Sequence, residues 1–240
     1  MSAARDTTGG FNEMPAVGIE DLLGGRPPLI LAPHPDDESL GCGGLIAAAC
    51  AAGLPPTVAI LTDGAASHPH SRLYPPARLA ALREDEALEA LNILGLPRQK
   101  CFFMREPDTK LSVDGALLDR LTAIALAEGC GIVIGPWQGD PHCDHETSAS
   151  IAEAIAIRLG TRLLSYPVWG WLREDGRLLA ELQKKGVRLD ISGQLGLKTR
   201  AIAAHASQYG KLITDAPTGF QLPEDLLAVF ARNHEMYLTR

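Results

Sequence analysis

Four ionisable side chains fall within a five-residue stretch of the chain: His34, Asp36, Asp37 and Glu38. His34 and Asp37 are three residues apart, so one turn of chain can aim both at a single point. An imidazole and a carboxylate together suit a first-row metal ion, of which zinc is the first candidate. The other Asp could then accept a proton from a metal-bound water, and the spacing permits either Asp in either role. A helix cap would account for one carboxylate but would leave His34 unexplained.

A second polar cluster contains Asp140, His142, Asp144 and His145. Its two His repeat the three-residue spacing of the first cluster. Taken alone, this cluster could be a polar loop with His on the surface. Two such clusters in equivalent sequence contexts are much harder to explain by chance, so we expect them to form one metal site.

The elements around the two clusters indicate how they could meet. Each cluster follows a short apolar run that is typical of a buried strand, at residues 28–32 and 131–136. Each precedes a helical run, at residues 39–52 and 147–158. In open parallel α/β sheets, ligand sites collect where strands end and helices begin.

The rest of the chain predicts an α/β fold: a single-domain, three-layer αβα structure with a Rossmann-like, mostly parallel sheet and helices on both faces. Further strands are expected at 57–61, 101–104 and 161–168, with an edge strand at 188–191. Helices are expected at 19–23, 77–94, 117–127, 194–209 and 223–237. Arg232 and His234 in the last helix should be exposed. Residues 1–17 should form a flexible N-terminal arm, and residues 18–240 the folded domain.

Composition narrows the possible functions. The 240 residues carry a net charge of −7 with no basic run, which argues against a nucleic-acid partner. No apolar run reaches the length of a membrane span, and the N-terminus lacks the pattern of a signal peptide. Five Cys without a CxxC pair form no disulfide framework, so a cytoplasmic location is expected. The sequence leaves the oligomeric state open.

One alternative ligand is a nucleotide, because Gly-rich sequence follows the first strand at Gly41–Gly44. The segment lacks the G-x-G-x-x-G spacing, and the acidic residues before it would repel phosphate. A dinucleotide site is therefore discounted.

The two clusters together resemble the motifs of the PIG-L/LmbE-like N-acetylglucosaminyl deacetylases, which are zinc amidohydrolases. The first motif, Ala-His-Pro-Asp-Asp-Glu in that family, stands here as residues 33–38 with Pro33 in place of Ala. The second, His-Pro-Asp-His, stands as residues 142–145 with Cys143 in place of Pro. Neither change removes a functional side chain. The resemblance covers about residues 28–210 and includes a turn at 62–64, an Arg-x-x-Glu helix at 83–86 and a late helix with Lys198, His205, Ser207 and Gln208.

The resemblance implies a cofactor and roles for the clustered residues. It assigns a Zn²⁺ ion to the ligands His34, Asp37 and His145, and the role of general base to Asp36. A protonated His142 would help to stabilise the oxyanion. Asp144 would orient His142 and raise the pKa of its imidazole, as a neighbouring carboxylate should.

The substrate implied is a small N-acetylated amino sugar, deacetylated by metal-activated water. Arg83 and Asp108 would bind it, although Arg83 could instead pair with Glu86 or Glu89 on the surface, and Asp108 could be a simple turn residue. Other hypotheses are an amidase with the same mechanism acting on a different amide, such as a thiol conjugate, and a non-catalytic metal-bound module.

Five other residues are possible site residues. Trp169 and Trp171 flank a glycine after the strand at 161–168, so they could stack on a sugar, although core packing is slightly favoured. His68 and His70 are expected to be a solvated loop pair. The late-helix residue His205 is expected to be buried and hydrogen-bonded rather than a metal ligand.

Overall fold

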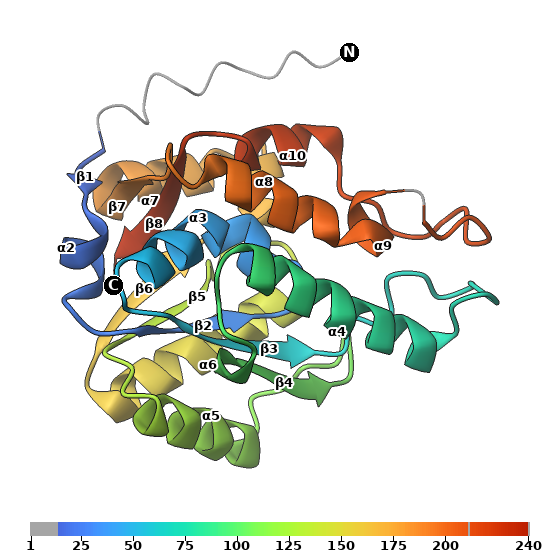
Figure 1. Ribbon diagram of the computed structural model, residues 1–240, viewed down its shortest axis with the longest axis horizontal. Helices are drawn as coiled ribbons and strands as arrows, with labels where there is room; N and C mark the ends of the chain where they lie inside the picture. The colour runs from blue at the N-terminus through green and yellow to red at the C-terminus, as the bar shows by residue number, and fades with distance from the viewer. Residues whose placement is uncertain (1–13, 211, 240) are drawn as a thin grey trace.

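An eight-stranded, mostly parallel sheet runs through the middle of the molecule (Figure 1). The computed structural model describes residues 14–210 and 212–239. The strands are β1 (Ala16–Val17), β2 (Pro28–Ala32), β3 (Thr57–Thr62), β4 (Cys101–Glu106), β5 (Ile132–Pro136), β6 (Arg162–Tyr166), β7 (Gly186–Asp190) and β8 (His234–Thr239). Their order across the sheet is β1-β7-β8-β6-β5-β2-β3-β4. Only β8 runs antiparallel to its neighbours, β6 and β7. The expected α/β class and mostly parallel sheet are confirmed.

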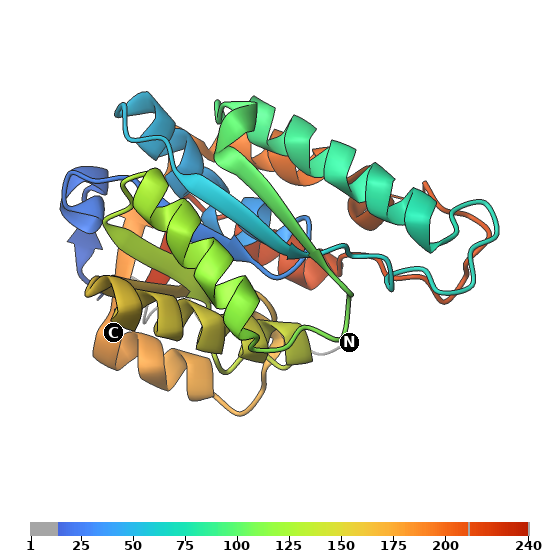
Figure 2. The same ribbon diagram turned by 90° about the horizontal axis from the view of Figure 1, so that it is seen from below.

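Helices cover both faces of this sheet, which gives the expected three layers (Figures 1 and 2). The helices are α2 (Ile19–Leu23), α3 (Asp37–Ala51), α4 (Pro76–Ile93), α5 (Gly115–Ala127), α6 (Cys143–Leu159), α7 (Arg177–Lys185), α8 (Leu195–Ala204), α9 (Ala206–Tyr209) and α10 (Glu224–Phe230). Two 3-10 turns, η1 (Arg98–Lys100) and η2 (Trp169–Leu172), complete the elements.

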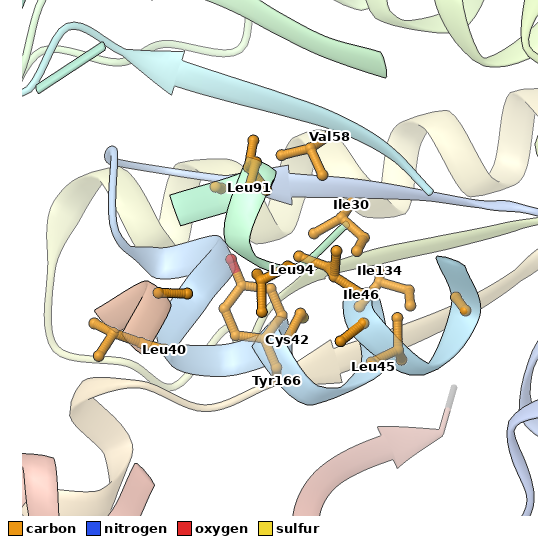
Figure 3. Packing of buried hydrophobic residues seen from close by; sticks show 14 of the residues in the cluster. Ile30, Leu40, Cys42, Leu45, Ile46, Val58, Leu91, Leu94, Ile134 and Tyr166 are labelled. Carbon is orange, nitrogen blue, oxygen red and sulfur yellow. The ribbon is translucent and has the colours of Figure 1, made fainter. Parts of the chain in front are cut away.

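The central strands are buried on both faces because alternate side chains enter different cores. In β2, Ile30 and Ala32 join the core under α3, α4 and α8, whereas Leu29 and Leu31 join the core under α5 and α6. This two-residue period is the geometry of a strand between two helix layers. Figure 3 shows part of the first core, where strand side chains gather with those of α3 and α4: Ile30, Val58, Ile134, Leu45, Ile46 and Leu91.

The Gly-rich segment lies inside helix α3 rather than in a phosphate-binding turn. A Cβ added at Gly41 would lie 2.1 Å from the Tyr166 ring, and one at Gly44 would lie 2.5 Å from the Ile191 side chain. These glycines therefore serve close packing of the helix against its neighbours.

The structure corrects the expected C-terminal helix at 223–237. The helix ends at Phe230, and His234–Thr239 form β8, which lies between β6 and β7 in the sheet. Glu235 is buried there, and hydrogen bonds compensate its charge. Lys198 Nζ and the Gly44 and Leu45 amides donate to its carboxylate over 2.7–2.8 Å. The sequence predicts that Arg232 and His234 are exposed, but both side chains are partly buried in the structure. These contacts come from distant parts of the chain, which local sequence patterns do not reveal.

Three smaller expectations also change. The expected edge strand is β7, which lies one place inside the sheet edge between β1 and β8. The expected helix at 194–209 breaks at His205 into α8 and α9. In the expected N-terminal arm, Met14 is buried and Ala16–Val17 pairs with β7, so this part belongs to the sheet, while residues 1–13 lie outside the described residues.

Within residues 14–210 and 212–239, no helix is both long and apolar enough to cross a membrane.

Candidate metal centre

The two polar clusters meet at the point in the sheet where the order of successive strands reverses. From β2 the chain proceeds outward to β3 and β4, then returns to place β5 on the other side of β2. The loops after β2 and β5 must diverge there, which leaves a crevice at the carboxyl ends of the strands. The motifs at 33–38 and 140–146 occupy this crevice.

The first motif forms a strained turn between β2 and α3. Asp36 has φ 141°, a conformation that a non-glycine residue rarely adopts. The turn is held by Glu38, whose carboxylate accepts the Asp36 amide hydrogen over 3.0 Å, and by the Asp36 carbonyl, which accepts from the Ser39 and Leu40 amides. Backbone strain that the surroundings maintain in this way is concentrated at functional sites.

Behind this turn, Glu38 contacts His205 in the protein interior. The His205 Nε2 atom lies 3.1 Å from the Glu38 carboxylate and 3.2 Å from Ser39 Oγ, and both Glu38 and His205 are buried. This confirms that His205 is a buried, hydrogen-bonded residue. Burial alone would lower the pKa of His205, but the charge and hydrogen bond of Glu38 raise it above its usual value.

Replacing His205 with Gln is expected to destabilise the protein in a pH-dependent way. A His whose pKa is higher in the folded state stabilises that state fully below its unfolded pKa, and the stabilisation is lost as the pH rises through the folded pKa. The difference in melting temperature between the wild type and His205→Gln should therefore be largest at acidic pH and shrink at alkaline pH. Thermal melts across a pH series test this, and a constant difference would show that the imidazolium contributes nothing.

The second motif begins helix α6. His142 is the N-cap, and its Nδ1 atom accepts the Asp144 amide hydrogen over 3.2 Å. His145, one turn into the helix, is completely buried. Its Nδ1 atom donates to the Asp140 carboxylate over 3.0 Å, so its Nε2 atom faces the first motif with a free lone pair when the ring is neutral.

The imidazoles of His34, His142 and His145 gather around one point. Each offers a ring nitrogen within 4.8 Å of the others. Asp37 Oδ2 lies 3.2 Å from His34 Nδ1 and 3.3 Å from His145 Nε2, so this carboxylate lies between two of the three rings. The structure thus brings together the expected ligands His34, Asp37 and His145, and places His142 beside them.

The donor set fits a metal ion. His145 Nε2 is buried and lies 3.3 Å from Asp37 Oδ2, yet within residues 14–210 and 212–239 no partner forms a hydrogen bond with it. A buried ring nitrogen without a hydrogen-bond partner is costly, and a metal ion would satisfy it. Two imidazoles and a carboxylate are the ligands expected for zinc and similar ions.

The charges around the cluster favour an added cation. Burial alone would lower the pKa of His145, but Asp37 and Asp140 raise it to about 9. The pKa of His34 is likewise raised, against the effect of burial, by hydrogen bonds to Asp108, Asp144 and Asp37. Burial would raise the pKa of Asp37, but the two imidazoles hold it well below its usual range. The carboxylates that stabilise a proton on these rings would also stabilise a metal ion in its place.

Asp140 is a residue whose role the sequence analysis missed. Its carboxylate is fully buried, receives the His145 Nδ1 hydrogen bond, and also accepts from the Val168 and Gly170 amides over 2.9 and 2.6 Å. This carboxylate–histidine pair fixes the ring orientation and tautomer of His145. The sequence does show a carboxylate five residues before His145. It does not show the amide donors to that carboxylate, because they come from the loop after β6.

Replacing Asp140 with Asn is expected to weaken metal binding by roughly 10- to 100-fold, because partners of ligand residues typically contribute this much. Titration of the metal-free variant with zinc in a competing chelator measures the change. Asp175→Asn, which alters an exposed carboxylate in the loop before α7, is a control that should bind zinc like the wild type. Equal affinity of Asp140→Asn and the wild type would exclude a role of Asp140 in the centre.

The structure supports the expected role of Asp144 only in part, because its charge acts to raise the pKa of His142 but its carboxylate faces His34. Its carboxylate contacts His34 Nε2 at 3.1 Å and accepts from the Thr109 and Leu111 amides, whereas only its backbone amide reaches His142. The net pKa of His142 is nevertheless lowered, first by burial and then by the charges of His34 and His145, which outweigh the opposing charges of Asp37 and Asp144. Asp144 therefore positions His34, and His142 Nδ1 acts as a hydrogen-bond acceptor.

Asp36 lies beside the cluster with Arg83 as its charge partner. Arg83 Nη2 donates to Asp36 over 3.1 Å and to the Pro35 carbonyl over 2.7 Å, and Nη1 donates to the Gly64 carbonyl over 2.9 Å. Burial raises the pKa of Asp36 to about 6, although the Arg83 charge opposes this shift. The alternative of a surface ion pair for Arg83 is wrong, because this side chain is buried.

A cavity of about 410 Å³ opens in front of these residues. His34, Asp36, Asp37, Arg83, Asp108 and His142 line one part of it. Asp108 Oδ1 lies 3.3 Å from His34 Nε2, and Oδ2 accepts from the Ala66 amide over 2.8 Å. Both expected substrate-binding residues, Arg83 and Asp108, thus reach the cavity.

The remaining candidates divide between the cavity and the core. Trp169 and Trp171 both pack against the hydrophobic core, and Trp169 also lines the cavity. His70 is exposed as expected, but His68 is buried beside Ser67 and Gly219.

Comparison with known proteins gives one family match. Residues 29–156, which include both motifs, match the family described as PIG-L, GlcNAc-PI de-N-acetylase. A probable N-acetyl-α-D-glucosaminyl L-malate deacetylase 2 from Bacillus anthracis is 30% identical over 194 residues, covering 78% of this chain and 83% of that protein. A diacetylchitobiose deacetylase from Thermococcus kodakarensis is 26% identical over 198 residues, covering 75% of this chain and 69% of that protein.

Among solved structures, the N,N′-diacetylchitobiose deacetylase from Pyrococcus horikoshii superposes with a TM-score of 0.68. It is 21% identical, and the match covers 90% of this chain and 84% of that one. This similarity supports the fold.

Proposed function

We propose that this chain, which belongs to the PIG-L (GlcNAc-PI de-N-acetylase) family, is a metal-dependent deacetylase of an N-acetylated amino sugar. The observation that carries the proposal is the buried His145 Nε2 atom, which finds no hydrogen-bond partner in the described part of the chain and faces the Asp37 carboxylate near His34. A metal site of this kind at the end of a cavity suits hydrolysis of an amide. Both curated relatives described above are named as deacetylases of acetylated sugars.

We assign His34, Asp37 and His145 as the ligands, and zinc as the metal. Asp37 is favoured over His142 as the third ligand because its Oδ2 atom contacts both other ligands. His142 lines the cavity and is only partly buried, which leaves it free to contact the substrate. Bound zinc would polarise the acetamide carbonyl and lower the pKa of a bound water.

Asp36 is assigned as the general base that accepts the proton of the attacking water. It lines the cavity next to the ligand Asp37, and Arg83 holds its carboxylate in place. The same carboxyl group can return the proton to the amine nitrogen as the amide bond breaks.

His142 is assigned to the carbonyl oxygen. Because His142 Nδ1 accepts the Asp144 amide hydrogen, the neutral ring carries its proton on Nε2. This N–H can donate to the oxygen that becomes negative, so a protonated imidazolium is not required. Asp108 is assigned to sugar hydroxyls, since a carboxylate can accept from two neighbouring O–H groups.

The test is acetate release from N-acetylglucosamine-bearing compounds by the purified protein, with and without a chelator. Release that the chelator abolishes and added zinc restores is the expected result. Activity that persists in the metal-free protein would contradict the proposed mechanism. If zinc-loaded protein releases no acetate from any acetylated sugar but cleaves other amides, the alternative of an amidase with the same mechanism is correct.

We also propose a cytoplasmic location. The five Cys at 42, 50, 101, 130 and 143 are all free, which is typical of a reducing compartment.

A further inference from the structure

Two loops that are far apart in the sequence contribute to the lining of the cavity. The β3–α4 loop covers residues 63–75, and the α9–α10 loop is described at residues 210 and 212–223. They project side by side beyond the sheet (Figures 1 and 2). The lining residues that they supply are Ala66, Ser67 and Pro69 from the first loop, and Thr218, Phe220 and Leu222 from the second. The shape of the cavity therefore depends on how these two loops are held together.

Asp215 of the α9–α10 loop bonds to three consecutive residues of the β3–α4 loop. Its Oδ1 atom accepts from Ser71 Oγ over 2.7 Å. Its Oδ2 atom accepts from the Arg72 and Leu73 amides over 2.7 and 2.9 Å. Ser71 Oγ in turn accepts the Tyr74 amide hydrogen over 2.9 Å. Hydrogen bonds to an ionised acceptor are stronger than neutral ones, so this one carboxylate joins the two loops.

Apolar packing supports the same junction. Ile213 and Ala216, on either side of Asp215 in the sequence, are buried against Leu79 of α4, and Tyr74 packs on them. Within residues 14–210 and 212–239, these side chains form a small core separate from the two large cores that cover the sheet. The loop pair is thus held by packing of its own as well as by hydrogen bonds.

Gly219 lets the two loops approach closely. A Cβ added at Gly219 would lie 2.1 Å from Cδ2 of the His68 ring and 2.9 Å from the Ala216 carbonyl oxygen, both closer than atoms can pack. The next residue, Phe220, donates its amide hydrogen to the Ser67 carbonyl over 2.9 Å. This close contact accounts for the burial of His68, which the sequence analysis expected to be solvated. A residue with a side chain at position 219 would force the loops apart.

We propose that Asp215 and Gly219 are positioning residues for substrate binding, because they lock the β3–α4 and α9–α10 loops together as a preformed wall of the cavity. Neither residue belongs to the described lining of the cavity, so both act through the lining residues of their loops. A preformed wall spares the substrate the cost of ordering the loops when it binds.

This role is separate from the chemistry of the metal centre. The assigned ligands His34, Asp37 and His145 come from the junctions after β2 and β5, outside both loops. Loosening the loops should therefore weaken substrate binding and leave zinc binding and the rate of the bound substrate nearly unchanged. The proposal rests on the proposed deacetylase function and adds the residues that keep its cavity in shape.

The kinetic test measures acetate release from methyl N-acetylglucosaminide by zinc-loaded protein. Asp215→Ala and Gly219→Ala should each raise KM by about tenfold, with kcat and zinc content within about twofold of the wild type. Asp215→Asn should recover part of the loss, since its side-chain oxygen can still accept from the amides. Gly196→Ala in α8, where an added Cβ meets no atom within 4 Å, is the matched control and should behave like the wild type. Asp215→Ala still tests the proposal if Gly219→Ala does not fold.

Limited proteolysis tests the junction without any substrate. Arg72 is exposed, and its amide is one of the groups that Asp215 holds. Cleavage by trypsin after Arg72, followed by mass spectrometry, should be about tenfold faster in Asp215→Ala than in the wild type, because cleavage follows the population of the opened loop. An equal rate would show that Asp215 does not hold the loops.

The outcomes separate this proposal from the proposed function. An unchanged KM in both Asp215→Ala and Gly219→Ala, or a fall in kcat and zinc content instead, would overturn the positioning role and leave the deacetylase function standing. Absence of acetate release from the wild type would refute the proposed function. Calorimetry with methyl N-acetylglucosaminide would then decide the positioning role, since Asp215→Ala should weaken binding about tenfold and an equal affinity would contradict it.

Discussion

Asp36→Asn is expected to reduce kcat for acetate release by about 10²- to 10⁴-fold, the usual contribution of a general base. An amide cannot accept the proton of the attacking water, yet it has nearly the size of a carboxylate and can still accept from Arg83. Asn differs from Asp by one atom type only, so the strained turn at Asp36, with φ 141°, should keep its geometry. Metal content should therefore match the wild type.

To test this, kcat and zinc content are both measured on the same preparation of Asp36→Asn. Asp119→Asn, in which an exposed carboxylate on α5 is changed, is the control and should keep full activity. Full activity of Asp36→Asn would remove Asp36 from the mechanism. Loss of both zinc and activity would instead indicate that Asp36 is a ligand and that its role and that of Asp37 must be exchanged.

His145→Ala is expected to abolish both metal binding and activity. The affinity for zinc should fall by more than about 100-fold, because a ligand contributes at least as much as the partner that positions it. The substitution also leaves the buried carboxylates of Asp37 and Asp140 without a shared partner, so the variant should be less stable. Zinc content after dialysis and the melting temperature measure the two effects.

Two further variants make this experiment specific. His70→Ala removes an exposed His and should retain zinc and activity. His142→Ala distinguishes the two possible ligand sets, since it should retain zinc if Asp37 is the third ligand and lose it if His142 is. Full retention of zinc by His145→Ala would contradict the assigned centre.

The local chemistry of the site could be predicted from the sequence because it lies in short segments. His34 and Asp37 are separated by one turn, as are His142 and His145, and each pair lies at the junction between a strand and the helix that follows it. Apolar strands that alternate with helices then dictate a parallel sheet, which brings such segments to one edge. The buried, hydrogen-bonded position of His205 agrees with that level of reasoning.

Other features required the tertiary structure because they depend on which distant segments become neighbours. The sequence could not show that Asp140 would receive amides from the loop after β6, or that Asp144 would contact His34 rather than His142. It also could not show that residues 234–239 form β8, because that strand is stabilised by pairing with β6 and β7 rather than by its own pattern.

The sequence by itself therefore determined the type of fold and the residues that could bind a metal ion, since both depend on local spacing and hydrophobic period. Only the tertiary structure decided the partners of those residues and the shape of the cavity. Trp169, Gln208 and Phe220 come from three segments and meet at one cavity only after the loops have packed. Hydrogen bonds and charge pairs act over a few ångströms, so their energies are set by contacts that chain spacing does not specify.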